Sequence, residues 1–143
     1  MLTKAEGFNQ TARGEDTTDI WLTPRALVEA IGPFDLDPCA APDPRPWPTA
    51  ARHYTEAEGD GLTRPWDGFV WLNPPYGSQT FDWMDKLAAH PGGGVALTFA
   101  RTETKGFHRA VWEKATGILF IKGRLKFCRP DGTTGGTAGA PSV

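Results

Sequence analysis

The sequence predicts an α/β fold built on a compact, mostly parallel sheet with helices on its faces. Short apolar runs alternate with amphipathic stretches from residue 69 to residue 121, in the order strand, helix, strand, helix, strand. That order is typical of a parallel sheet with right-handed crossovers. A chain of 143 residues is long enough for one domain with its own core. We expect residues 20–143 to form that domain and the polar residues 1–19 to be flexible.

The first half of the chain contains clear start and stop signals. Thr23-Pro24 predicts a helix start, with the threonine as the cap and the proline as the first helical residue. Gly32-Pro33 predicts the end of that helix, and residues 34–37 predict a short strand. Residues 38–48 contain five prolines, a density that leaves no regular element and predicts an ordered loop.

The second half alternates between apolar strands and amphipathic helices. The expected elements are strands at residues 69–72, 95–99 and 118–121, and helices at residues 80–89 and 104–114. The side chains expected to face the core from the first of these helices are Phe81, Met84, Leu87 and Ala88. Residues 125–127 alternate in polarity and predict a C-terminal β-hairpin. Residues 140–143 are too short for a complete strand, so we expect the hairpin region to be truncated or completed by a partner chain in a homo-oligomer.

Composition excludes several classes of protein. A hydrophobic content of 39% with six tryptophans is typical of a globular protein. No apolar run approaches the roughly 18 residues that a membrane span needs, and the N-terminus lacks the apolar region of a secretion signal. The two cysteines, Cys39 and Cys128, cannot form a disulfide framework or a four-ligand zinc site. The simplest interpretation is an intracellular protein with reduced thiols.

Charge is distributed unevenly, although the net charge is only −2. Residues 101–129 contain eight basic and two acidic side chains, whereas the first hundred residues contain seven basic and fourteen acidic ones. A basic C-terminal region on an acidic body can face phosphates. An ordinary solvated face would have the same composition, and the charge pattern alone leaves both interpretations open.

The segment Asn73-Pro74-Pro75-Tyr76 carries the most chemical information. It follows the apolar run at residues 69–72, so it should lie at the carboxyl edge of the sheet, where α/β folds bind ligands. Its prolines remove two backbone donors and stiffen the loop, which leaves carbonyl acceptors, an amide and an aromatic ring. Such a loop can accept hydrogen bonds from an amino group and stack on a flat ring, and an amino-substituted nucleobase offers both. The alternative is an ordinary turn.

Taken in order along the chain, several segments resemble the amino-methyltransferases that use S-adenosylmethionine. In closer detail they resemble the small phage-type DNA N-6-adenine methyltransferase family. The supporting segments are residues 21–24, 35–40, 60–62, 71–77, 101–104 and 122–127. The resemblance implies a Rossmann-like methyltransferase fold and methylation of the exocyclic N6 of adenine in double-stranded DNA, with the base flipped out. It also implies a cytoplasmic location, in the bacterial host if the protein is phage-encoded.

The resemblance also assigns residues to an S-adenosylmethionine site. Thr23 and Pro24 would lie beside the methionine carboxylate, and Asp37 would take the amino group. Asp60 is the candidate for the cofactor's adenine amino group, with a simple turn residue as the equal alternative. The full set of expected cofactor-binding residues is Trp21, Thr23, Pro24, Asp37, Pro38, Cys39, Ala40, Asp60, Leu62 and Asn73. Residues 38–40 depart from the Gly-rich turn usual in this superfamily.

The expected catalytic residues are Asn73, Pro74, Pro75 and Tyr76. The Asn73 side chain and the Pro74 carbonyl would accept hydrogen bonds from the adenine amino group, which localises its lone pair, and Tyr76 would stack on the base. No general base and no metal are required for this reaction. The expected DNA-binding residues are Arg101, Lys105, Lys122, Arg124, Lys126 and Phe127, with a core position as the more favoured interpretation of the phenylalanine.

Two other functions remain open at this point. An RNA or protein methyltransferase would use the same loop, because the amide nitrogen of glutamine poses the same lone-pair problem. A catalytically inactive relative that only binds DNA or cofactor is the third possibility. The basic segment at residues 101–129 favours DNA as the substrate.

Overall fold

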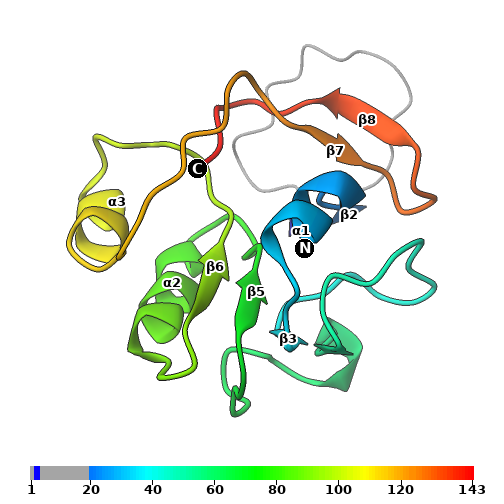
Figure 1. Ribbon diagram of the computed structural model, residues 1–143, viewed down its shortest axis with the longest axis horizontal. Coiled ribbons are helices and arrows are strands. Elements are labelled where there is room, and N and C mark those ends of the chain that lie inside the picture. Colours follow the sequence, from blue (N-terminus) through cyan, green and yellow to red (C-terminus); the bar gives the residue numbers. More distant parts are fainter. Residues whose placement is uncertain (1, 4–19) are drawn as a thin grey trace.

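A four-stranded parallel sheet forms the centre of the molecule (Figure 1). The computed structural model describes residues 2–3 and 20–143; residues 1 and 4–19, for which flexibility is expected, lie outside this description. The strands of the sheet, in spatial order, are β4 (Arg52–His53), β3 (Leu36–Asp37), β5 (Val70–Leu72) and β6 (Gly94–Ala96). Each neighbouring pair runs parallel. The predicted α/β class and parallel sheet are therefore confirmed.

The central strand β5 is buried on both faces of the sheet. Val70 and Leu72 point toward one hydrophobic cluster and Trp71 points toward another, because successive side chains of a strand alternate between faces. All three side chains are at most 1% exposed. A continuous apolar run is what a strand covered on both faces requires, and this explains why residues 69–72 could be recognised from the sequence.

The face of the sheet toward Val70 and Leu72 is covered by helices α2 (Thr80–Ala89) and α3 (Lys105–Phe107), the latter continuing as the π-helix η2 (His108–Trp112). Helix α2 has the predicted bounds, but its buried face differs from the prediction. Trp83 is buried beside Met84, whereas Ala88 is exposed. The expected long helix at residues 104–114 is a short α-helical turn that widens into the π-helix.

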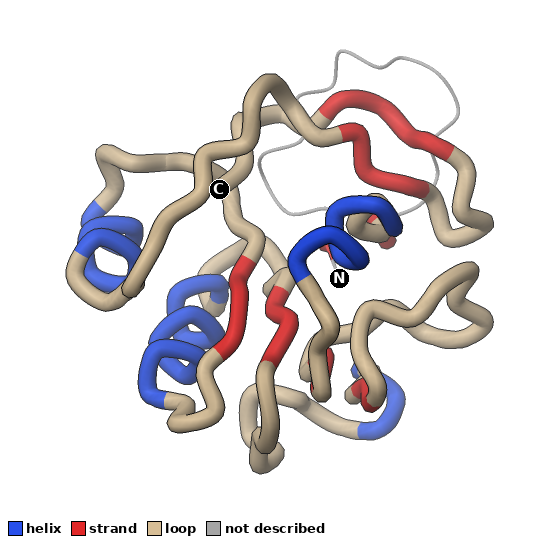
Figure 2. Tube along the Cα trace, viewed as in Figure 1, coloured by secondary structure: helices blue, strands red, loops and turns tan. Residues whose placement is uncertain are grey.

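Helix α1 (Arg25–Ile31) packs in the hydrophobic cluster on the opposite face, and a C-terminal hairpin lies beyond it, past the carboxyl ends of β5 and β6 (Figures 1 and 2). The hairpin consists of β7 (Lys126–Cys128) and β8 (Thr134–Thr137), which pair antiparallel as the sequence predicts. Phe127 in β7 is 0% exposed and belongs to the same cluster as Trp71. The prediction that it contacts DNA is therefore wrong, and its core position is confirmed.

Two further short elements complete the described fold. Strand β1 (Leu2–Thr3) pairs antiparallel with β2 (Ile20–Trp21), and the 3-10 helix η1 (Glu56–Glu58) follows β4. None of the helices in the described residues has the length and apolar character of a membrane span.

Helix α1 begins one residue later than predicted. Pro24 is its N-cap and Arg25 its first residue, and no side chain caps the helix. The threonine predicted as the cap instead has its hydroxyl turned toward Asn73, where Oγ1 accepts a hydrogen bond from Nδ2 at 3.1 Å. The predicted stop is confirmed, because Gly32 is the C-cap.

The predicted buried strand at residues 118–121 is not present. This segment has no regular structure, and Leu119 and Phe120 are 68% and 56% exposed. The position beside the extension of β6 is taken by the C-terminal residues, since Thr98 and Val143 exchange two backbone hydrogen bonds of 2.9 Å. The segment is thereby displaced outward, where the Ile121 N–H donates to the Ser142 carbonyl at 3.2 Å.

The two phenylalanines in this region should contribute very differently to stability. Phe127→Ala should lower the free energy of unfolding by about 3–5 kcal/mol, because it leaves a cavity in a well-packed core. Phe120→Ala, at an exposed position, should change it by less than about 1 kcal/mol. Urea denaturation of the two variants measures both effects, and equal losses would contradict this assignment of core and surface.

Candidate active site

The ends of β3 and β5 bring two of the predicted segments together. The two strands are neighbours and run parallel, with Leu36 paired to Val70, so their carboxyl ends meet at one edge of the sheet. The Cys39 thiol donates a hydrogen bond to the Asn73 carbonyl oxygen at 3.1 Å. This contact joins the loop after β3 to the Asn73-Pro74-Pro75-Tyr76 loop, as expected for a ligand site at the sheet edge.

Asn73 is held rigidly at the first position of its loop. The residue is 1% exposed, and its Nδ2 donates to the hydroxyl of Thr23, which is itself buried. With Nδ2 directed to Thr23, the amide points its Oδ1 away from that residue. A fixed acceptor orientation is what a site for an amino group needs, because no reorganisation is then required during the reaction.

The rest of the loop is anchored by helix α2. The Thr80 hydroxyl lies 2.9 Å from the Pro75 carbonyl oxygen and accepts a hydrogen bond of 2.8 Å from the Gly77 N–H. Pro74 is fully buried. The first residue of α2 therefore sets the path of the loop, and two prolines remove most of its remaining backbone freedom.

Tyr76 is half-buried against Phe99, with ring centroids 4.2 Å apart and ring planes inclined by 34°. Burial raises the pKa of the Tyr76 phenol above its ordinary value, so the ring stays neutral. Phe99 thus supports one side of the Tyr76 ring at the edge of the sheet. Arg101, two residues after Phe99, is exposed.

The Asp37 carboxylate lies at the end of β3 and is 2% exposed. Its Oδ1 accepts a hydrogen bond from the Cys39 N–H at 3.1 Å, and its Oδ2 accepts a short one from the Thr49 hydroxyl. Burial raises the pKa of the neighbouring Cys39 thiol to about 12, so that thiol is a neutral hydrogen-bond donor and not a nucleophile.

His53 holds the loop that carries Thr49. Its Nε2 accepts hydrogen bonds from the backbone N–H groups of Thr49 and Ala50, at 3.2 and 3.3 Å. Only a neutral imidazole can accept at this nitrogen. Burial, followed by the nearby charge of Arg45, lowers the pKa of His53 below its ordinary value of 6.5.

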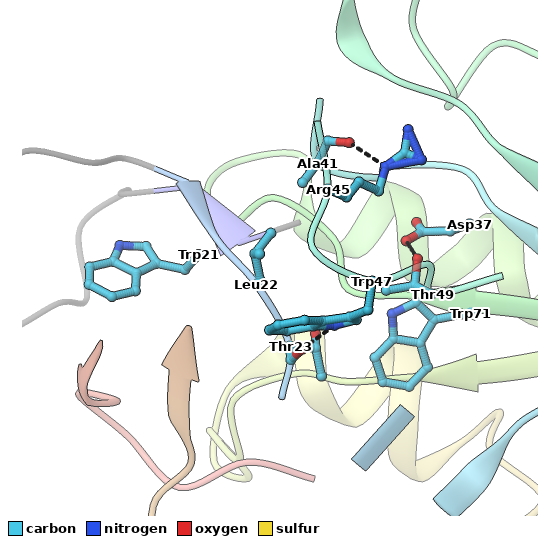
Figure 3. A pocket seen from close by; sticks show the side chains of 9 residues that line it. All are labelled: Trp21, Leu22, Thr23, Asp37, Ala41, Arg45, Trp47, Thr49 and Trp71. Carbon is cyan, nitrogen blue, oxygen red and sulfur yellow. Dashed lines mark hydrogen bonds between the residues drawn. The ribbon is translucent and has the colours of Figure 1, made fainter. Parts of the chain in front are cut away.

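A pocket lies beside Asp37, and Trp47 is among the residues that line it (Figure 3). Its lining residues are Trp21, Leu22, Thr23, Asp37, Ala41, Arg45, Trp47, Thr49 and Trp71. The Trp47 indole N–H donates to the Thr23 carbonyl at 3.2 Å, which fixes the aromatic wall. The pocket thus combines aromatic surfaces with one buried carboxylate and one guanidinium group.

Asp60 and Leu62 lie in a turn that packs against Pro38, the residue directly after β3. The Asp60 carboxylate accepts from the Leu62 N–H at 2.8 Å, so it forms the turn that was its alternative role. The turn packs tightly on Pro38, because a Cβ atom at Gly61 would lie 1.9 Å from the Pro38 carbonyl oxygen. Only a glycine permits this approach. Asp60 is exposed there, outside the pocket of Figure 3.

The expected cofactor residues therefore fall into three groups. Trp21, Thr23 and Asp37 line the pocket directly. Those in the adjoining segments, outside the lining, are Pro24, Pro38, Cys39, Ala40 and Asn73. Asp60 and Leu62 form the separate turn.

The sequence reasoning missed several lining residues within and after the Pro-rich segment, namely Ala41, Arg45, Trp47 and Thr49. A usable signal was present, because large polar and aromatic side chains alternate with the prolines at residues 44–48. Such side chains in a rigid loop directly after a strand are candidates for ligand contacts.

The basic residues expected to contact DNA are all exposed. They are Arg101, Lys105, Lys122, Arg124 and Lys126. Arg101 lies close to the Asn-Pro-Pro-Tyr loop, because it follows the segment that packs on Tyr76. Lys122 follows Ile121, which bonds to the C-terminal segment beside Phe99. These contacts connect the basic region to the same end of the sheet.

The fold and the site define an α/β protein with a stiff Asn-Pro-Pro-Tyr loop beside a pocket that has aromatic surfaces, one buried carboxylate and one guanidinium group. A sequence profile of the DNA N-6-adenine-methyltransferase (Dam) family matches residues 10–141. The chain belongs to this family, as the resemblance of its motifs indicated. No curated protein and no solved structure matches the chain.

The hydrogen bonds of His53 make the loop sensitive to pH. Because folding lowers the pKa of this imidazole, the unfolded chain binds the proton more readily. The contribution of His53 to stability is complete above about pH 6.5 and is lost as the pH falls below it. We expect His53→Gln to flatten the decrease in unfolding free energy between about pH 7 and pH 5. The exposed His108→Gln is the matched control, and an unchanged slope in His53→Gln would contradict this role.

Proposed function

We propose that the protein transfers the methyl group of S-adenosylmethionine to the exocyclic N6 amino group of adenine in DNA. The observation that carries the proposal is the direct contact between two loops at the sheet edge. One loop presents the buried Asp37 carboxylate, the other presents the oriented amide of Asn73, and the Cys39 thiol joins them. Membership of the Dam family supports the reaction class and DNA as the substrate.

The loop is suited to activate a weakly nucleophilic nitrogen. The lone pair of an adenine amino group is delocalised into the ring, and hydrogen bonds from both of its N–H groups to fixed acceptors localise it. Asn73 Oδ1 and the Pro74 carbonyl are the acceptors in our proposal. Their contribution is positioning and electrostatic stabilisation in a buried site, so no general base is needed before transfer.

Tyr76 is suited to hold the flat face of the base. Phe99 supports one side of the ring, and the part of Tyr76 that remains exposed can stack on a base extruded from the duplex. The phenol is neutral and therefore places no negative charge beside an electron-rich base, and burial raises its pKa further.

The pocket beside Asp37 fits the cofactor by the chemistry of its residues. When bound, S-adenosylmethionine would supply an electrophilic methyl group on a sulfonium centre. Asp37 can pair with an ammonium group, and the wall formed by Trp47 can cover apolar parts of the ligand. With this assignment, residues 20–143 form one domain of the Rossmann-like methyltransferase type.

The function is tested by incubating the protein with radiolabelled S-adenosylmethionine and plasmid DNA, RNA or a Gln-containing peptide in parallel. Label in DNA, recovered as N6-methyladenine after nuclease digestion, supports the proposal. Label in RNA or peptide alone would replace DNA with that substrate. Absence of transfer to all three, despite cofactor binding, would indicate an inactive relative.

The Asn73 amide should matter more for the reaction than for cofactor binding. Asn73→Ala should lower the rate of methyl transfer by roughly a hundredfold or more, because an acceptor that acts as the nitrogen rehybridises is lost. Asn73→Asp should lower the rate of methyl transfer less, since an acceptor remains. Single-turnover rates and calorimetric cofactor affinities separate the two effects. Ser78→Ala, in the exposed part of the same loop, is the control, and a wild-type rate in Asn73→Ala would contradict the mechanism.

The basic surface should make DNA affinity depend on salt. If four or five of the exposed basic side chains contact phosphates, the slope of log affinity against log salt should be about −4. Replacing Arg124 and Lys126 with Glu should flatten that slope and weaken binding to all sequences alike. Arg52→Glu, on β4 at the opposite edge of the sheet, is the control. A wild-type slope shallower than about −1 would make the region a solvated face.

A further inference from the structure

Trp71 presents a buried polar atom that the proposed mechanism does not use. The residue is 1% exposed, and its indole Nε1 has no hydrogen-bond partner among the described residues. Buried donors are nearly always paired in folded proteins, so an unpaired one at a pocket wall indicates a position where a ligand acceptor binds. Figure 3 shows the nitrogen edge of this ring turned toward Thr49, in the pocket that contains Asp37.

Arg45 contributes a second hydrogen-bond donor to the same pocket, and this donor is also cationic. Its side chain is only 12% exposed. Nε donates to the Ala41 carbonyl at 3.1 Å and one terminal nitrogen pairs with the exposed Asp43 at 2.8 Å, so the guanidinium is held in place by its own loop. A guanidinium has five N–H donors, which leaves donors for an additional anionic partner.

The three groups are complementary to an α-amino acid. An α-amino acid carries one ammonium and one carboxylate on the same carbon, so its site needs an anionic acceptor and separate donors a few ångströms away. Asp37 supplies the acceptor, whereas the indole N–H of Trp71 and the Arg45 guanidinium supply donors on other walls of the pocket.

We propose that Trp71 and Arg45 bind the carboxylate of the amino-acid end of the cofactor, while Asp37 binds its ammonium group. This rests on the proposed function and assigns the carboxylate differently from the sequence prediction, which placed it at Thr23 and Pro24. The hydroxyl oxygen of Thr23 accepts the hydrogen bond from Asn73 Nδ2. Thr23 accordingly acts as a positioning residue for the catalytic amide, and the Trp71 and Arg45 side chains bind the anion.

The test compares two ligands by calorimetry. S-adenosylhomocysteine carries the amino-acid end, and 5′-methylthioadenosine keeps the nucleoside and sulfur but lacks that end. Trp71→Phe keeps an aromatic ring at this core position and removes the N–H donor together with part of the indole ring system. This change should lower the affinity for S-adenosylhomocysteine about tenfold or more, because a hydrogen bond to a charged group is lost. The affinity for 5′-methylthioadenosine should stay the same. Arg45→Met should show the same selectivity.

Two matched variants control for indirect effects of the substitutions on ligand affinity. Trp112→Phe removes an indole N–H that donates to Thr102 on a partly exposed surface, and Arg52→Met removes an exposed guanidinium. Neither should change the affinity for either ligand. If Trp71→Phe fails to fold, as judged by its near-UV circular dichroism, Arg45→Met carries the test alone.

The outcomes distinguish this inference from the proposed function. Wild-type protein that binds neither ligand would contradict the proposed function itself. Two outcomes would contradict only the carboxylate assignment. In one, the wild-type protein binds both ligands with equal affinity; in the other, the variants lower the affinity for both ligands alike. Unchanged affinity for S-adenosylhomocysteine in both Trp71→Phe and Arg45→Met would likewise overturn the assignment, since neither donor would then contact the ligand.

Discussion

The parallel pairing of β3 with β5 is the constraint on which the site depends. Asp35 sets this pairing at the start of both strands: its N–H donates to the Phe69 carbonyl at 2.8 Å, and its carboxylate accepts from the Phe69 N–H at 2.6 Å. The preceding Gly68 has φ +72°, and a Cβ there would lie 2.5 Å from the Asp35 side chain. With the register fixed here, Asp37 and Asn73 must emerge at the same edge.

Strands of two or three residues provide few ladder hydrogen bonds, so side chains complete the organisation of the edge. A continuous series of contacts runs from Thr23 through Asn73 and Cys39 to Asp37, and then through Thr49 to His53. It joins the segment before α1, both site loops and the residues that follow the Pro-rich segment. Because each group is held by its neighbour, the Asn73 amide and the pocket beside Asp37 form one unit. A disturbance at either end should therefore reach the other.

Sequence reasoning was most accurate where one local rule dominated. Helix α2 has its predicted bounds because a polar loop and a Pro-Gly stop flank an amphipathic stretch. The prediction from the sequence was wrong at residues 118–121, whose apolar character is typical of a buried strand. The C-terminal residues, more than twenty positions later, occupy the adjacent edge instead. Competition between two segments for one position depends on their shapes in space and is not encoded in the local pattern.

The sequence by itself determined the chemistry of the site: an α/β sheet, an Asn-Pro-Pro-Tyr loop at its carboxyl edge, and Asp37 at the end of a neighbouring strand. These follow from strand patterns and stiff turns, which act over a few residues. Only the tertiary structure decided the partners. It placed Thr23 on Asn73, and it brought Arg45, Thr49 and Trp71 around one pocket. Such contacts join residues that are distant in the chain, and they depend on the packing of both faces of the sheet.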